Sequence, residues 1–213
     1  MSIVTYNNRS IANISAIPGA AKSLTHIKTL TASSSSTLSF VDGSDDVVLD
    51  STYPIYLFKF VNMHPASDSN FTFQGSTNTG SSYGVTITTT SFSAYNYETY
   101  TGAGAAGVGY DGGAEDLAQS TDFQRLYQIS NSNDASLSGE LFLFNPSSTT
   151  FVKHFIATTN RNNDADGTGS QFARAGYNAG YFNTTSAVDA MQFKMSSGNI
   201  DVGTIKLYGL KDS

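Results

Sequence analysis

The chain of 213 residues contains no cysteine and no tryptophan. The lack of cysteine excludes disulfides, thiolate catalysis and zinc–thiolate sites together. The missing Cys–Trp–Cys set also argues against an immunoglobulin-like domain, whose core depends on it. Charged residues make up only 13% of the chain, compared with about 25% in an ordinary globular protein. Apolar packing and backbone hydrogen bonds must therefore hold the fold together.

Basic charge and long apolar runs are scarce as well. The formal net charge is −6, and the 11 lysine and arginine residues are scattered, which gives no electrostatic basis for binding nucleic acid. The N-terminal residues lack a basic segment followed by an apolar run, and no stretch of 18 apolar residues occurs anywhere,. We therefore expect a protein made in the cytoplasm, with neither nucleic acid nor a membrane as a partner.

Short runs of alternating apolar and polar residues are abundant, and the most regular pair closes the chain. Residues 191–195 and 200–210 each alternate with a period of two, which predicts half-buried strands,. The turn-forming cluster Ser196-Ser197-Gly198-Asn199 between them predicts that the two strands pair as an antiparallel hairpin. A break in the alternation at Gly203 indicates a β-bulge.

Further strand patterns fill most of the chain, which predicts an all-β fold. Residues 54–65, PIYLFKFVNMHP, are apolar on both faces and should form a central strand, and residues 136–146 and 150–158 should form a hairpin,. Nine or ten short strands joined by turns are typical of an antiparallel two-sheet sandwich. Long connections favour a jelly roll. We expect one jelly-roll domain over residues 23–213.

Three segments depart from the strand pattern. Residues 114–130, AEDLAQSTDFQRLYQIS, form the one helical candidate, so at most one short helix is expected,. Residues 99–113 and 160–178 are rich in glycine, asparagine and aspartate and predict two long loops,. Residues 1–22 fit neither helix nor strand periodicity and predict an extended N-terminal arm, lying on its own sandwich or on a neighbouring subunit. The arm presents the candidate interface residues Ile3, Val4, Tyr6, Ile11, Ile14 and Ile17.

Motifs for catalysis or cofactors are incomplete. Gly102, Gly104 and Gly107 match G-x-G-x-x-G, but the glycine-rich residues 108–113 cannot form the helix that a dinucleotide site requires at that position,. The three histidines lack metal-binding spacing, and no G-x-S-x-G elbow is present. We therefore expect a protein that is not an enzyme and binds no cofactor.

One segment resembles a metal-binding loop in part. Asn162, Asp164 and Asp166, followed by Gly167, copy the first half of a calcium loop,. The position that should hold a bidentate glutamate is Ala173. A solvated asparagine- and aspartate-rich turn is the favoured interpretation, with calcium as the alternative.

Tyrosines cluster in and beside the two predicted loops. They are large, rigid and amphipathic, so they could stack on sugars, form a protein interface, or simply cover the ends of the sandwich. The candidate ligand-loop residues are Tyr95, Tyr97, Tyr100, Tyr110, Tyr177 and Tyr181.

Four segments together resemble a family of virion structural proteins of tailed bacteriophages, especially marine and cyanobacterial ones. These are SIVTYNNRSIANISAI, YPIYLFKFVNMHP, GELFLFNPSSTTFVKHF and FKMSSGNIDVGTIKLYGL. The resemblance spans nearly the whole chain and rests on strands and turns, so it transfers no catalytic residue. It implies a jelly-roll subunit on the exterior of a virus particle.

The resemblance leads to two functional hypotheses. The first is a capsid decoration or cement protein made in the host cytoplasm, which binds the major capsid protein or other virion subunits as a homo-oligomer, a trimer being favoured. The alternative is a tail or fibre-associated adhesin that binds host surface glycans through the tyrosine-bearing segments.

Overall fold

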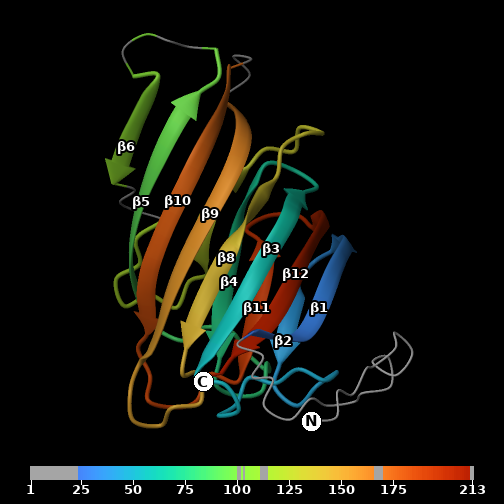
Figure 1. Ribbon diagram of the computed structural model, residues 1–213, viewed down its shortest axis with the longest axis vertical. Coiled ribbons are helices and arrows are strands. Elements are labelled where there is room, and N and C mark those ends of the chain that lie inside the picture. The colour runs from blue at the N-terminus through green and yellow to red at the C-terminus, as the bar shows by residue number, and fades with distance from the viewer. Residues whose placement is uncertain (1–23, 100–101, 103, 111–114, 166–169, 212–213) are drawn as a thin grey trace, which may run out of the picture.

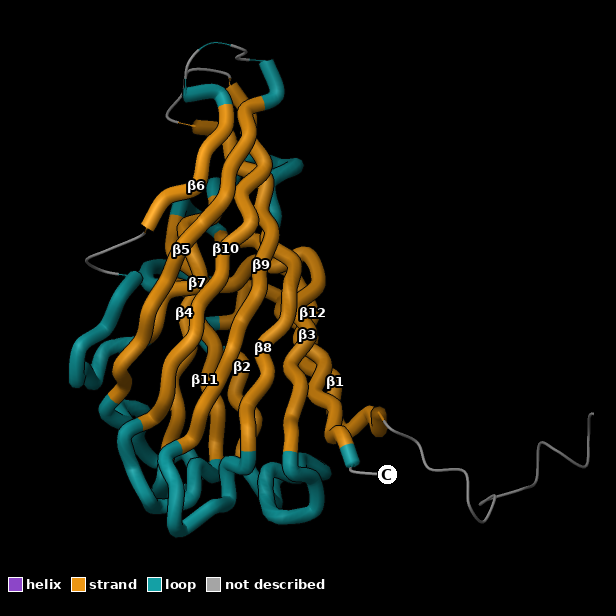
Figure 2. Tube along the Cα trace, turned by 60° about the vertical axis from the view of Figure 1, so that its left-hand side comes forward, coloured by secondary structure: helices purple, strands orange, loops and turns teal. Residues whose placement is uncertain are grey.

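The structure is a computed structural model that describes residues 24–99, 102, 104–110, 115–165 and 170–211. Within those residues the chain forms twelve strands and no helix, arranged in two antiparallel sheets that lie face to face (Figures 1 and 2). The prediction of an all-β, antiparallel two-sheet sandwich is confirmed. The predicted arm, residues 1–22, lies outside the described residues.

The two sheets differ in size. In spatial order, the eight-stranded sheet contains β1 (Leu24–Ser35), β12 (Ile200–Leu210), β3 (Ile55–Pro65), β8 (Leu137–Phe144), β9 (Lys153–Ala165), β10 (Ser170–Phe182), β5 (Ile87–Tyr97) and β6 (Ala106–Tyr110). The four-stranded sheet contains β2 (Leu38–Val41), β11 (Ala190–Met195), β4 (Ser69–Ser76) and β7 (Gln124–Ile129). Strands β5, β6, β9 and β10 reach beyond the others at one end, which we call the distal end (Figure 1).

A cluster of phenylalanine rings fills the space between the sheets. Phe193 of β11 is fully buried, and its ring lies 5.3 Å from the rings of both Phe58 and Phe60 of β3, measured between centroids. Phe71 and Phe73 of β4 flank it at 6.0 and 6.4 Å. Aromatic side chains bury more apolar area than any others, so this cluster dominates the packing between the sheets.

The predictions for the central strand, the β8–β9 hairpin and the bulge are confirmed. Strand β3 lies between β12 and β8, and β8 pairs antiparallel with β9. The pairing of β12 with β3 shifts register between Val202 and Thr204, where Gly203 has φ of 139°. A residue with a side chain rarely adopts that backbone conformation, which explains the glycine.

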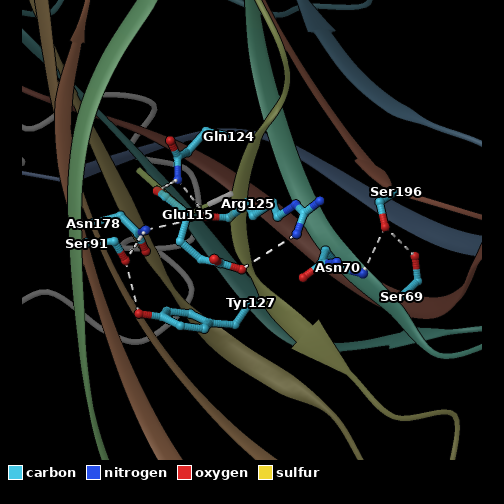
Figure 3. Close-up of polar contacts among 9 residues, drawn as sticks. All are labelled: Ser69, Asn70, Ser91, Glu115, Gln124, Arg125, Tyr127, Asn178 and Ser196. Carbon is cyan, nitrogen blue, oxygen red and sulfur yellow. Dashed lines mark hydrogen bonds and ion pairs between the residues drawn. The ribbon is translucent and has the colours of Figure 1, made fainter. Parts of the chain in front are cut away.

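The predicted C-terminal hairpin is wrong, because β11 and β12 belong to different sheets. The turn between them is bound to β4. The Ser196 N–H donates to the Asn70 carbonyl at 2.8 Å. Ser196 Oγ accepts from the Asn70 N–H at 3.1 Å and lies 3.0 Å from Ser69 Oγ (Figure 3). Alternation with a period of two identifies a half-buried strand but not its partner. The turn therefore carries the chain from one sheet to the other.

The predicted helix at residues 114–130 is also wrong, since Gln124–Ile129 forms strand β7. Gln124 and Leu126 are buried, and a positive φ of 96° at Tyr127 interrupts the alternation, so that Ile129 is again buried. This break in the period removed the strand signal from the sequence.

The second predicted long loop, residues 160–178, is largely strand, and the first, residues 99–113, contains one short strand. Ala106–Tyr110 forms β6, while β9 and β10 cover most of residues 160–178. Glycines weakened the prediction, yet at Gly176 a small residue is required by packing. A Cβ atom there would overlap the ring of Tyr127. A glycine that suggested a loop in the sequence therefore marks a position where a side chain of the other sheet packs closely against the strand.

Candidate interaction surface

The larger sheet has one face packed against the smaller sheet and one face that no described strand covers. We call the second the open face. Strand β9 illustrates the division: Lys153, Phe155 and Ala157 are buried, whereas His154 and Ile156 between them are exposed. Successive side chains of a strand point to opposite faces, so the exposed set belongs to the open face.

Large apolar side chains are exposed mainly on the open face. Nine are exposed among the described residues: Leu24, Val61, Phe92, Val108, Tyr110, Phe151, Ile156, Tyr177 and Val202. Strand registers and burial patterns place seven of these on the open face. Phe151 lies in the β8–β9 turn, and Val202 lies beside the β12 bulge, where the register shifts. Isolated exposed apolar residues are ordinary, but a concentration on one face marks an interaction surface.

Five of the seven gather on β5, β6, β9 and β10, and we call this group the aromatic patch: Phe92, Val108, Tyr110, Ile156 and Tyr177. The rings of Phe92 and Tyr177 are stacked with centroids 4.8 Å apart and planes 11° apart. Tyr110 stands directly opposite Phe92 in the β5–β6 pair, and 72% of its surface is exposed. The stack fixes two rings in place, so binding a partner costs them little conformational entropy.

The candidate tyrosines do not form one site. Tyr110, Tyr177 and Tyr181 lie in strands with their side chains on the open face, where Tyr181 packs edge-on to His154 with centroids 6.0 Å apart. Tyr95 and Tyr97 lie on the opposite face of β5, in an edge-on contact at 5.9 Å. Tyr100 lies outside the described residues. All five described tyrosines lie in strands. The predicted position within a loop is therefore wrong for Tyr110 and Tyr177, while Tyr95, Tyr97 and Tyr181 are predicted beside the loops.

Arginines accompany the tyrosines on the inner face of the distal end. Arg161 and Arg174 are paired directly across β9 and β10. Each guanidinium lies 5.3 Å from the ring centroid of Phe172, and Arg174 lies 5.4 Å from that of Tyr95. Aromatic faces stabilise cations, which permits two like charges to face each other here. No sequence pattern indicates this cluster, because its members come from three strands.

A buried polar network ties the smaller sheet to the distal end of the larger one (Figure 3). The Tyr127 hydroxyl of β7 donates to the Phe92 carbonyl at 3.1 Å and lies 3.0 Å from Ser91 Oγ of β5. Asn178 of β10 donates its amide to Ser91 Oγ at 2.9 Å. Asn178 Oδ1 is buried without a hydrogen-bond partner among the described residues, but these bonds join β5, β7 and β10 and fix their relative positions,. Through Ser91 and the Phe92 carbonyl, this network supports the aromatic patch from behind.

The outer surface of the smaller sheet carries an open hollow of about 400 Å³, lined in part by Phe123, Arg125 and Lys194. The Lys194 ammonium lies 4.1 Å from the Phe123 ring centroid, and Arg125 lies 3.8 Å from the Glu115 carboxylate. These charged groups have partners within the protein, which accounts for their positions without a ligand.

Lys153 is fully buried at the start of β9. Its ammonium donates to the carbonyls of Phe151 and Thr184 at 3.0 and 3.1 Å, and desolvation lowers the pKa of the amine below its ordinary value. The group closes the β8–β9 turn against the segment after β10. We interpret Lys153 as a structural residue.

Asn162, the first of the candidate calcium ligands, has hydrogen-bond partners within the protein. The Asn162 side chain accepts from the Ser136 N–H at 2.9 Å and donates to the Asp134 carbonyl at 2.9 Å. Asp164 lies in β9, and Asp166 lies outside the described residues. In the part of the chain that the structure describes, no three histidine, aspartate or glutamate side chains are grouped so as to hold a metal ion.

Comparison of the chain with protein-family models, with curated proteins and with solved structures yields no match. The described residues also include no helix long and apolar enough to cross a membrane.

Proposed function

We propose that this protein is a structural subunit of a virus particle, most specifically a capsid decoration or cement protein that binds the major capsid protein on the particle exterior. The observation that carries the proposal is the aromatic patch, held on a rigid sheet. Exposed aromatic residues of this kind are enriched at protein interfaces. The likeness of four sequence segments to phage virion proteins suggests the identity of the partner.

The order of the strands supports this proposal. If the hairpins β5–β6 and β9–β10 are set aside, eight strands remain in the orders β1-β12-β3-β8 and β2-β11-β4-β7. Each successive strand among the eight lies in the opposite sheet, except that β4 and β7 follow each other as neighbours in the smaller sheet. We infer from this alternation a jelly-roll connectivity, which viral capsid proteins use. The two hairpins then extend one sheet of the jelly roll and carry the aromatic patch.

The mechanism would be burial of the aromatic patch against the shell. Apolar surface removed from water contributes about 25 cal/mol per Å². A subunit that binds only the assembled shell stabilises the shell by mass action. The stabilising free energy grows with the logarithm of the ratio of the free subunit concentration to Kd. Neither step requires a reaction. The proposed role is therefore non-enzymatic, and it puts the protein on the virion surface, as a homo-oligomer with a trimer favoured.

Incorporation into particles that lack this protein tests the proposal. Phe92→Asp introduces a charge into the aromatic patch, and we expect it to lower incorporation about tenfold or more, which corresponds to about 1.4 kcal/mol of lost binding. Phe151→Asp is the matched control, since Phe151 is 69% exposed but lies outside the open face. Equal incorporation of both variants and the unmodified protein would exclude the patch as the binding surface.

A tail or fibre-associated adhesin is the second candidate, and the stacked rings of Phe92 and Tyr177 favour it. A pair of fixed, exposed rings can stack on the apolar face of a sugar. This function predicts that Tyr177→Ala abolishes adsorption to host surface glycans while incorporation into particles is retained. Loss of incorporation with adsorption unchanged would assign the patch to the capsid instead.

A further inference from the structure

The four outer edges of the two sheets are protected to different degrees. Strand β1 has a register irregularity between His26 and Lys28 and carries that lysine. Strand β7 carries Arg125, and its pairing with β4 is irregular between Asn70 and Thr72. Strand β2 has only four residues. Charges, bulges and short length are the usual means by which a protein keeps a sheet edge from pairing with another chain.

Strand β6 has little of this protection. Its five residues, AGVGY, include no charge and no proline, and it pairs with Phe92–Asn96 of β5 without a register shift. On its other side no described strand pairs with it. Val108 and Tyr110 are 77% and 72% exposed. An unprotected edge that exposes apolar side chains and unpaired backbone groups is a template for an added strand.

We propose that β6 accepts the first residues of the N-terminal arm of a neighbouring copy, residues 2–6, as an added strand. This inference rests on the proposed function in one respect: the added strand would be the contact that joins the copies of the proposed homo-oligomer. Residues 2–6 read Ser-Ile-Val-Thr-Tyr. Four of these five are β-branched or aromatic, the types that suit a strand, and the run matches β6 in length.

The place where the arm joins the sandwich favours a neighbouring copy over the same chain. The arm ends at Leu24 in β1, the first strand in the order of the larger sheet, whereas β6 is the last. Seven strand spacings separate these edges, or roughly 34 Å. In addition, β1 begins at the opposite end of the sheet from the distal end, where β6 pairs with β5 (Figure 1). Within one chain the arm would have to cross the sheet diagonally.

When two copies stand side by side, the arm of one copy no longer has to cross its own sheet to reach a β6 edge. The β1 edge of one copy then stands beside the β6 edge of the next, and residues 7–23 form a linker of 17 residues that spans up to about 56 Å when extended. The contact joins different surfaces on the two copies, so it is heterologous. Heterologous contacts that close give rings, which agrees with the proposed trimer.

Disulfide cross-linking tests the pairing, because the chain has no cysteine of its own. Val108→Cys is introduced into a tagged copy, and Ile3→Cys, Val4→Cys, Thr5→Cys or Tyr6→Cys into an untagged copy. Each pair is mixed at high protein concentration, free and on particles, and oxidised. Cross-strand neighbours on one face lie about 5 Å apart and alternate along the strand. We expect two alternate positions, either 3 and 5 or 4 and 6, to cross-link several-fold more than the other two.

Phe151→Cys replaces Val108→Cys in the control, since Phe151 is 69% exposed against 77% for Val108 and lies in the β8–β9 turn, with β10 and β5 between β9 and β6 in the sheet. Cross-linking without the alternation, or no stronger than this control, would overturn the inference. Two further results would also do so. One is cross-linking of Val108→Cys to itself, which would mean that two β6 edges pair. The other is cross-linking within one chain, seen when Val108→Cys and an arm cysteine are placed in the same copy, with none between the tagged and untagged copies. Incorporation into particles is measured separately, so loss of the arm contact leaves the proposed function standing.

Discussion

Tyr177 of β10 stacks on Phe92 of β5 on the open face, with ring centroids 4.8 Å apart and planes 11° apart. The two residues are 39% and 46% exposed, although their rings touch each other. The backbone carbonyl of Phe92 accepts a hydrogen bond from the Tyr127 hydroxyl of the smaller sheet. The core, the buried network and the exposed patch are therefore connected through one residue of β5.

The phenylalanine cluster should dominate stability. Phe193→Ala removes a fully buried ring that contacts five other phenylalanines. We expect the free energy of unfolding to fall by about 3 to 5 kcal/mol, measured by urea denaturation. Val108→Ala is the control, because Val108 is 77% exposed and should change the stability by no more than about 0.5 kcal/mol. A loss below about 1 kcal/mol for Phe193→Ala would contradict the packing described.

Two glycines allow a matched test of strand packing at the distal end. A Cβ at Gly176 would overlap the Tyr127 ring, whereas a Cβ at Gly109 would meet nothing within 4 Å. Gly176→Ala should therefore destabilise the protein by about 1 to 3 kcal/mol, and Gly109→Ala should have almost no effect. Thermal unfolding of both variants measures the difference. Similar melting temperatures would show that Tyr127 does not pack against β10 as described.

Lys153 should give stability a dependence on alkaline pH. Burial lowers its pKa in the folded state below the ordinary 10.5, so the unfolded state binds more protons between those two values. Stability contributed by this group therefore rises as the pH increases through that window. The measurement is the free energy of unfolding against pH, up to about 10.5. Lys153→Met should remove the rise, and Lys59→Met, at a lysine that is 46% exposed, should retain it. An identical slope for all three proteins would contradict the assignment.

Much of the fold could be predicted because its signals are local. The apolar run of β3 and the alternation in β8 and β9 identify strands without reference to any partner. The errors arose where the determinant lies elsewhere in the chain. Nothing near Ser196 reveals that its N–H binds Asn70 of another strand, and nothing near Gly176 reveals that Tyr127 packs against it.

The candidate site was less predictable for the same reason. The sequence marked Tyr110 and Tyr177 but placed them on loops, and it grouped them with Tyr95, which points to the opposite face of the sheet. Phe92 carried no signal beyond its place in a strand. Which face a strand exposes depends on the second sheet, and the smaller sheet leaves one whole face of the larger one uncovered.

Hydroxyl-radical footprinting of the particle-bound and free protein tests the central claim most directly, because it reports the exposure of each aromatic side chain. We predict that oxidation of Phe92, Tyr110 and Tyr177 falls several-fold on binding to particles, while oxidation of Phe151 stays the same. Unchanged oxidation of the three aromatic patch residues, with protection confined to Phe151 and other residues outside the open face, would contradict the account.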